Sequence, residues 1–532
     1  MPARRSTNLL WLLAVLTGAA LRLYQIRDQV LVDDEWHALH ALLAGGPLDV
    51  LLSFGASDHS IPLTLYDLLL ERTVGLTELG MRLPSLLAGI ASLVVLPWLV
   101  RDLAGLRASV VFAWLLAIAP LHVFFSRYAR PYELAMLLCF VAVVACYRWL
   151  AGGGRRWQVA FVGCAIVAPW LLLVTLPVVA TPLALAVVAA CTGVRATLRA
   201  RALLVTALVV VGGWTLLLAP PLLANAGAVS DKVARGTVEL ATLRGASELL
   251  LGTPSAPLRL LVLAAALAGA IVLARAQPRF AAWVAIVCAA QLAALLMVRP
   301  HGLRFPIVFA RYCFALSPFL LLTIALGVDA ADRRLAASVR WARGPLVSAV
   351  VLVVLAGGGP LGWIYAWPND FTNHGSFQAD YAPGRYFERF RPAVIPDFYG
   401  SLAQRPPGSV TIVEAPWHYF WHSLAYTQRI HRQHVVVGFV DPGSGKVRNG
   451  EVPRERTGIR LRNALHVGDQ AALRARGVDY VILHHDAHAE MRVPFAAPPV
   501  RADAWIAAYR ESYGAPVHED AAITVFDVRE GE

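Results

Sequence analysis

Lysine, acidic residues and cysteine are all scarce in this chain. Only 15% of its 532 residues are charged, 58% are hydrophobic, and lysine occurs only at positions 232 and 446. A soluble protein carries about 25% charged residues, so this composition indicates a polytopic membrane protein instead. No basic run carries the interleaved aromatic residues that favour nucleic-acid binding, and we therefore expect no nucleic acid among its partners.

The few cysteines are placed like packing residues. All six lie in or at the ends of apolar segments, and none follows residue 313: Cys139, Cys146, Cys164, Cys191, Cys288 and Cys313. A free cysteine behaves as a small hydrophobic residue when it is buried. We therefore predict buried thiols rather than a disulfide framework or a metal site.

Long apolar runs dominate the first two thirds of the chain. They lie near residues 8–24, 82–100, 109–125, 132–150, 158–175, 177–193, 203–221, 257–274, 280–298, 309–328 and 345–366. A span needs about 20 residues, so these runs predict about eleven transmembrane helices. The first run also has features of a cleavable signal peptide. We favour an uncleaved span, because cleavage would leave an even number of spans and disturb the topology.

Arginine orients these spans. Arg4 and Arg5 precede the first run, and every second loop is short and carries further arginines. By the positive-inside rule this side of the membrane is cytoplasmic. The N-terminus is therefore predicted to be cytoplasmic, and an odd number of spans places the C-terminus outside.

The chain changes character after Trp367. Residues 368–532 are polar, and β-like runs such as "SVTIVEAP" and "VDYVILHH" alternate with helical stretches near 467–477 and 502–512. We predict a transmembrane module at 1–366 and an extracytoplasmic α/β domain at 367–532. The "DPGSGKV" segment lacks the residues of a phosphate loop, so we expect no ATPase. We predict that the polar side chains of "VILHHDAHAE" lie on the surface of the domain.

The first outer loop, about residues 25–80, carries an acidic run. Asp33, Asp34 and Glu35 are followed by His37. Carboxylates can act as general bases toward a hydroxyl, and together with histidine they can also bind a divalent cation, so a metal stays possible. Two stretches of the loop, "EWHALHALLAG" and "SIPLTLYDLLLERTVGL", have helical apolar spacing that predicts amphipathic interfacial helices.

Asp58 and His59 stand just before the second of these helices. They are candidates for substrate binding, as is His37. Asp58 has an equally good structural interpretation, because an aspartate that precedes a helix often caps its first backbone N–H groups.

Two outer loops carry arginine against the orientation bias. "FFSRYARPYEL" contains Arg127, Arg130 and Tyr132, and "VRPHGLRFPIVFARY" contains Arg304, Arg311 and, as its last residue, Tyr312. These side chains can reach lipid head groups or pair with acids of the first loop. Alternatively they form an anion site, because a guanidinium matches two phosphate oxygens at once. A carboxylate base opposite such a site fits sugar transfer from a lipid phosphate to a hydroxyl.

These motifs, in this order, resemble the GT-C superfamily of membrane glycosyltransferases. The resemblance is closest to family-39-type enzymes such as the protein O-mannosyltransferases and the lipid A aminoarabinose transferase. It covers about residues 8–330 and rests on "DDEW", "DHSIPLTLY", "GMRLPSLLAG", "SRYARPYELAMLL" and "ARYCFALSPFLLL". It implies a polytopic GT-C fold in a bacterial inner membrane and an inverting transferase that uses a polyprenyl-phosphate sugar.

The resemblance also suggests roles for single residues. Asp34 matches the proposed base of the family, with Asp33 as a rival one residue away and Glu35 as a supporting or metal-binding acid. Arg127, Arg130 and Arg311 would face the donor phosphate. Ile61 replaces the first proline of the family's pair after an inserted Ser60, which leaves the role of His59 open.

The partners implied are the lipid-linked donor, an acceptor lipid, polysaccharide or protein, and membrane lipids. Two other functional classes remain as alternatives: a transporter or flippase of a lipid-linked saccharide, and a non-catalytic membrane scaffold. Transporters often show internal repeats and broken helices at the membrane midplane. We find no repeat here, and a scaffold would not need outer arginines opposite acids.

Overall fold

The computed structural model describes residues 2–27, 31, 33–54, 59–191, 200–227, 230, 233, 236–300, 302–338, 345–358, 360–365, 394–415, 427, 430–435, 458–461, 467–485 and 503–529. Contacts divide the chain into two units. The first comprises Met1–Ile26, Leu48–Leu65 and Met81–Gly362, and the second Arg27–Pro47, Tyr66–Gly80 and Trp363–Glu532. Parts of the first outer loop thus belong to the same unit as the C-terminal domain.

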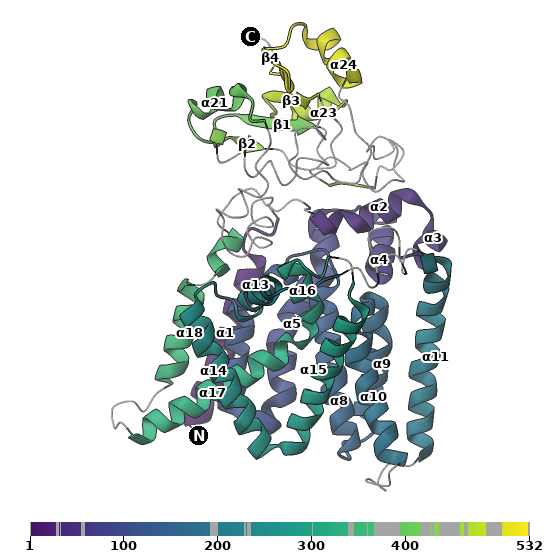
Figure 1. Ribbon diagram of the computed structural model, residues 1–532, viewed down its shortest axis with the longest axis vertical. Coiled ribbons are helices and arrows are strands. Elements are labelled where there is room, and N and C mark those ends of the chain that lie inside the picture. The colour runs from purple at the N-terminus through teal and green to yellow at the C-terminus, as the bar shows by residue number, and fades with distance from the viewer. Residues whose placement is uncertain are drawn as a thin grey trace. The chain divides into compact units, whose positions relative to one another are not determined.

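Helices make up nearly all of the first unit (Figure 1). Up to Gly358 the chain forms α1 (Pro2–Leu23), α2 (Trp36–Ala44), α3 (Pro47–Leu51), α4 (Ile61–Arg72), α5 (Glu78–Ala104), α6 (Leu106–Ile118), α7 (Pro120–Ser126), α8 (Tyr132–Leu150), α9 (Arg155–Leu171), α10 (Leu176–Cys191), α11 (Ala200–Ala224), α13 (Leu240–Leu251), α14 (Ala256–Ala276), α15 (Pro278–Val298), α16 (Pro306–Cys313), α17 (Ser317–Ser338) and α18 (Leu346–Gly358). Short 3₁₀ turns lie at η1 (Asp33–Glu35), η2 (Leu173–Thr175), η3 (Phe314–Leu316) and η4 (Pro360–Tyr365).

The polytopic helical fold is confirmed, with fewer full spans than predicted. The described part of every apolar run is mainly helical. Within the described residues eight helices are long and apolar enough to cross a membrane, or nine if the bent pair α6–α7 is one span. The apolar runs had suggested about eleven. The difference arises because α9 has only 17 residues and α18 only 13, whereas a span needs about 20.

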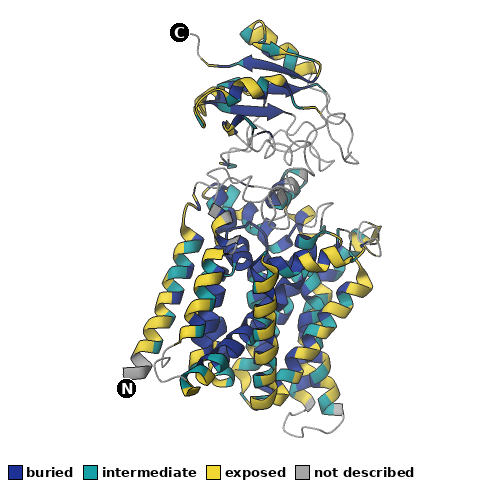
Figure 2. Cartoon of the chain, turned by 60° about the vertical axis from the view of Figure 1, so that its left-hand side comes forward, coloured by how far each residue is buried: buried dark blue, intermediate teal, exposed yellow. Residues whose placement is uncertain are grey.

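The outer faces of the long helices are apolar and exposed. Figure 2 shows exposed residues along the outer helices and buried residues between them. Leu208, Leu223 and Leu260 are 63%, 78% and 68% exposed. Such side chains would be unfavourable in water, where burying apolar surface is worth about 25 cal/mol per Å², so these faces suit a lipid environment.

Helices α14 and α17 of the first unit pack with their backbones close together. A Cβ added to Gly269 would lie 1.7 Å from the backbone oxygen of Thr323, and one added to Gly327 would lie 1.9 Å from that of Ala265. The two backbones therefore touch at these glycines. Small residues at helix crossings are a common packing device in membranes, because van der Waals contact takes the place of the hydrophobic effect there.

The second unit contains a five-stranded sheet. Its strands are β1 (Thr411–Ala415), β2 (His434–Val435), β3 (Tyr480–His484), β4 (His518–Glu519) and β5 (Ile523–Asp527), in the order β2-β1-β3-β5-β4. β1 pairs in parallel with β2 and β3, and β5 pairs antiparallel with β3 and β4. Helices α21 (Asp397–Ala403), α23 (Gln470–Ala475) and α24 (Asp503–Tyr513) complete the described part of this α/β domain.

The strands and helices of this domain follow the sequence pattern. β1, β3 and β5 are almost wholly buried, as continuous apolar runs predict. Helix α23 begins where expected because the Asp469 side chain caps it, accepting a hydrogen bond from the Ala472 N–H at 3.1 Å. The "DPGSGKV" segment lies outside the described residues.

The first outer loop forms the two predicted helices, α2 and α4. Within the second unit the loop after α4 pairs with a C-terminal segment: the Leu76 N–H donates to the Gly458 oxygen at 2.7 Å, and the Arg460 N–H donates to the Leu76 oxygen at 2.8 Å. Gly458 is required there, because a Cβ would lie 2.1 Å from the Glu71 backbone oxygen. Asp67 on α4 is only 2% exposed, and this burial raises its pKa well above the ordinary value.

Candidate functional site

The site in the first unit is built around a sharp corner in the chain. Pro120 begins α7 after α6 has ended, and the two helices meet at a bend of 60°. A proline provides no N–H to continue the helix, so carbonyl groups at the end of α6 lack their usual partners. The Arg22 guanidinium supplies donors instead, to the Leu116 oxygen at 3.0 Å and the Ala117 oxygen at 3.3 Å.

Arg22 also fixes the other side of this corner. Its Nε donates to the Ser126 hydroxyl at 3.0 Å, and that hydroxyl donates to the His122 carbonyl at 2.5 Å. The side chain is fully buried. Gly89 leaves the necessary room, because a Cβ there would lie 2.0 Å from the Ser126 oxygen.

Replacing Arg22 with methionine should destabilise the protein by roughly 2–4 kcal/mol, because buried carbonyls would lose their donors at about 1–3 kcal/mol each. Thermal and denaturant unfolding of the purified full chain would measure this. Arg101→Met is the matched control. Arg101 is about half exposed and forms an ion pair with exposed Asp102, so a change within about 0.5 kcal/mol is expected. Equal stability of the two variants would contradict the bridging role.

Arg127, predicted to bind the donor phosphate, anchors the end of α1 in this structure. Its Nη1 donates to the backbone oxygens of Leu21, Arg22 and Tyr24, at 3.1, 3.3 and 2.5 Å. These carbonyls lie at the C-terminal end of α1, where intrahelical partners run out. This nitrogen is therefore engaged in positioning the turn that follows α7.

Arg130 and Arg311 converge on one tyrosine. The guanidinium carbons of Arg130 and Arg311 lie 5.8 and 6.0 Å from the centre of the Tyr132 ring, and Arg311 is also 5.5 Å from the Tyr312 ring. Arg130 is 6% exposed, and Ser85 fixes its backbone by donating to its carbonyl at 2.7 Å. The structure thus brings together two cations that are far apart in sequence.

The position of Tyr132 adds to this positive region. Tyr132 is the first residue of α8, and a helix N-terminus carries partial positive charge and free N–H groups. Two guanidinium groups at such an end favour an anion, and each can donate to two phosphate oxygens.

Arg304 and Tyr312 occupy different surroundings. Arg304 is exposed, with its guanidinium 5.0 Å from the ring of its neighbour Phe305. Its backbone oxygen accepts from the Thr242 hydroxyl at 2.7 Å. The Tyr312 carbonyl accepts from the Gln291 amide at 3.2 Å. His301, in the same loop, lies outside the described residues.

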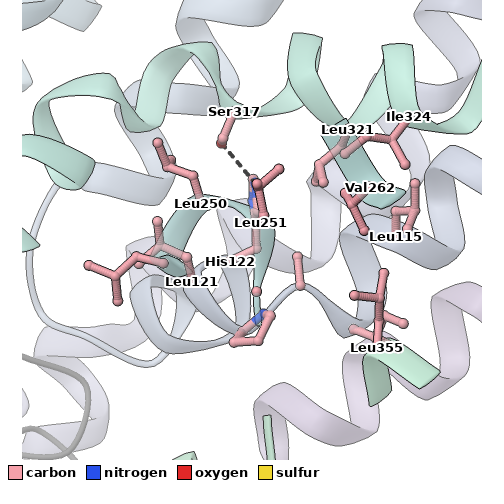
Figure 3. Close-up of a pocket in the computed structure, with 15 residues that line it drawn as sticks. Leu115, Leu121, His122, Leu250, Leu251, Val262, Ser317, Leu321, Ile324 and Leu355 are labelled. Atoms are coloured by element: carbon pink, nitrogen blue, oxygen red, sulfur yellow. Dashed lines mark hydrogen bonds between the residues drawn. The ribbon is translucent and has the colours of Figure 1, made fainter. Parts of the chain in front are cut away.

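A buried polar chain links the two arginine-bearing segments. His122 Nε2 lies 3.0 Å from the Ser317 hydroxyl, and His122 Nδ1 lies 3.5 Å from a carboxylate oxygen of Glu133. Ser317 begins α17 shortly after Arg311, and Glu133 follows Tyr132 directly. Figure 3 shows the His122–Ser317 contact in a pocket whose lining is mostly apolar and includes leucines of α6, α13 and α17. His122 therefore has a polar contact with the start of α17 and lies close to the Glu133 carboxylate at the start of α8, without a hydrogen bond to it.

The predicted acids belong to the second unit. Asp34 Oδ1 lies 3.6 Å from His37 Nε2, one helical turn away, and both side chains are partly exposed. Glu35 is fully buried. Asp34 is therefore the more accessible of these two carboxylates. Asp33 shares the same 3₁₀ turn, η1.

The remaining predicted residues are only partly described. His59 is 5% exposed and stands two residues before α4, while Asp58 lies outside the described residues. Within the described ranges no group of three or more His, Cys, Asp or Glu side chains is arranged to hold a metal ion.

Comparison with known proteins gives structural likenesses only. No protein-family model matches the chain, and no curated protein matches it. The fold is similar to ArnT from Cupriavidus metallidurans in the apo state, with a TM-score of 0.48, 16% identity and 100% of both chains covered. The undecaprenyl-phosphate-bound form of that protein has a TM-score of 0.48 and 15% identity, with 98% of both chains covered.

Two further likenesses are weaker. The oligosaccharyltransferase AglB from Archaeoglobus fulgidus, in complex with an inhibitory peptide and a dolichol-phosphate, has a TM-score of 0.43 and 12% identity over 91% of this chain and 70% of its own. The mycobacterial arabinofuranosyltransferase AftD has a TM-score of 0.40 and 16% identity over 99% of this chain and 42% of its own.

Proposed function

We propose that this protein transfers a sugar from a polyprenyl-phosphate donor to an acceptor hydroxyl. The observation that carries the proposal is the convergence of Arg130 and Arg311 on Tyr132 at the start of α8. Such a pair can bind the donor phosphate and stabilise the charge that it gains as the sugar leaves. Arg127 holds the turn in place, and exposed Arg304 is left out of the phosphate site.

The proposed base is Asp34, as the sequence resemblance implies. The acceptor hydroxyl attacks the anomeric carbon from the face opposite the phosphate, so the configuration is inverted. The bond between the anomeric carbon and the phosphate oxygen breaks, and polyprenyl phosphate leaves with the bonding electron pair. The hydroxyl proton passes to Asp34. A carboxylate is a weak base toward a hydroxyl, so proton transfer occurs late, as the bond to phosphate breaks.

The topology predicted from arginine supports a location for this chemistry. It places the first loop and both arginine-bearing loops on the outer side of a bacterial inner membrane. Nucleotide sugars are absent there, which is why a lipid-linked donor is proposed. The acceptor is a lipid, a polysaccharide or a protein of the cell envelope.

A polyprenyl phosphate without sugar should raise the melting temperature of the purified full chain. Ligand at a hundredfold excess over its Kd stabilises a protein by about 2.7 kcal/mol. Arg130→Ala and Arg311→Ala should remove this shift, because each loses a charged contact with the phosphate. Thermal unfolding with and without undecaprenyl phosphate measures the effect.

Arg304→Ala is the matched control, since it removes an exposed arginine of the same loop as Arg311. Its shift should equal that of the wild type. No shift in the wild-type protein would favour a non-catalytic scaffold. A shift that survives in Arg130→Ala and Arg311→Ala would place the phosphate elsewhere.

A further inference from the structure

A buried cluster of acid and imidazole groups lies in the C-terminal domain, at one edge of its sheet. Glu414 is the last residue but one of β1, and His484 is the last residue of β3. These two strands are parallel neighbours. The chain after β1 leads to β2 on one side, whereas the chain after β3 leads to β4 and β5 on the other. Ligands of open α/β sheets bind at such a point, beyond the carboxyl ends of the strands.

Only one carboxylate oxygen of Glu414 has hydrogen-bond partners among the described residues. Its Oε2 accepts from the Tyr399 hydroxyl at 2.5 Å and from His484 Nε2 at 3.0 Å. Its Oε1 is buried and accepts no hydrogen bond there. The prediction that the polar side chains of "VILHHDAHAE" lie on the surface is wrong for His484, which is 2% exposed. The Glu414 carboxylate holds the His484 imidazole inside the domain.

His431 presents the complementary atom. Its Nδ1 accepts a hydrogen bond from the Gln433 N–H at 3.0 Å, so the neutral ring carries its proton on Nε2. That nitrogen is buried and has no partner within the described part of the chain. Burial lowers the pKa of His431 to about 4, which keeps the ring neutral near pH 7. The His431 ring lies 5.6 Å from the ring of Tyr399, whose hydroxyl binds Glu414.

We propose that Glu414 and His431 bind a hydroxyl group of a saccharide. Among the residues that the structure describes, the cluster offers one carboxylate acceptor and one N–H donor without partners. A hydroxyl can donate to the first and accept from the second. The carboxylate disfavours an anionic ligand. A metal is disfavoured too, because the described residues contain no group of three metal ligands. An unpaired buried polar group costs about 1–3 kcal/mol. One bound hydroxyl would give a hydrogen-bond partner to Glu414 Oε1 and to His431 Nε2 at once.

This site would hold the acceptor saccharide, and that assignment rests on the proposed glycosyltransferase function. Saccharide binding itself is independent of catalysis. It can therefore be measured without a transfer assay, and the two proposals can fail separately.

Saturation-transfer NMR on the purified full chain tests the site, with methyl glycosides of arabinose, mannose and glucose as probes. At least one should bind the wild type, and Glu414→Gln and His431→Gln should weaken that binding by about tenfold or more, as expected for loss of a hydrogen bond to a charged or buried group. His485→Gln is the matched control. His485 adjoins the cluster in sequence but binds Thr524 on β5, at 2.7 Å, so its variant should bind like the wild type.

Two results would overturn the site. One is the absence of binding by all three glycosides, in which case the free atoms hold only an ordered water. The other is equal binding by the wild type and both cluster variants. Circular dichroism shows whether the variants are folded. The thermal shift with undecaprenyl phosphate should persist in Glu414→Gln. If the wild type shows no such shift, that result counts against the transferase function and not against the saccharide site.

Discussion

Asp34→Asn is expected to lower sugar transfer by about 10²–10⁴-fold, the usual contribution of a general base. Asparagine has nearly the shape of aspartate but cannot accept the hydroxyl proton. Folding and donor binding should persist, because Asp34 is partly exposed and lies 3.6 Å from His37. Mass spectrometry of cell-envelope glycans, in a deletion strain that expresses each variant, measures transfer in the absence of a known acceptor.

Neighbouring acids provide the controls for this result. Asp33→Asn should retain most activity if Asp34 is the base, and the reverse ranking would assign the role to Asp33. Glu35→Gln should affect stability more than chemistry, because Glu35 is fully buried. Full activity in a folded Asp34→Asn protein would remove the base from the proposed mechanism. The thermal shift with undecaprenyl phosphate confirms that each variant still binds a donor lipid.

Local patterns predicted the elements of this fold well. The described part of each apolar run is mainly helical, because a helix pairs its backbone N–H and C=O groups within the run, as a membrane environment requires. The strands of the C-terminal domain were recognisable because β1, β3 and β5 are buried on both faces and so read as continuous apolar runs. The number of full spans was harder to predict, since α9 ends at Leu171 and α18 at Gly358, and composition alone does not mark those ends.

The candidate site was predictable in residue type but not in arrangement. Arginine against the orientation bias drew attention to Arg130 and Arg311. Their meeting at Tyr132 depends on how α8 and α16 pack, which sequence spacing does not reveal. Arg127 looked equivalent to Arg130, yet it donates to the end of α1, a contact that spans about a hundred residues of sequence.

Other residues of the site gave no distinctive sequence signal. Ser317 and His122 are polar residues within apolar runs, a pattern that fits ordinary helix packing as well as a functional contact. His484 belonged to a polar stretch and was interpreted as exposed. Its burial depends on Glu414, which lies 70 residues earlier, and the pairing of β1 with β3 brings the two together.

Gly327→Ala is expected to destabilise the first unit by roughly 3 kcal/mol, at the upper end of the usual cost of overpacking. The new methyl group would lie 1.9 Å from the Ala265 backbone oxygen. A side chain could rotate away from such a contact, but a helix backbone cannot, so α14 and α17 would have to separate along their length. Gly269→Ala should act similarly, because its methyl group would lie 1.7 Å from the Thr323 oxygen. Thermal unfolding of the purified full chain measures both variants.

Gly212→Ala is the matched control, since Gly212 is also within a helix but a Cβ there meets nothing within 4 Å. It should be neutral or slightly stabilising, because alanine favours a helix over glycine by about 1 kcal/mol. The double variant Gly269→Ala/Gly327→Ala should cost less than the sum of the single variants, because helices already moved apart by one methyl group accommodate the second more easily. Wild-type stability in Gly327→Ala would mean that the two backbones do not touch at this crossing. Additive costs would mean that each methyl group is accommodated by local distortion rather than by separation of α14 from α17.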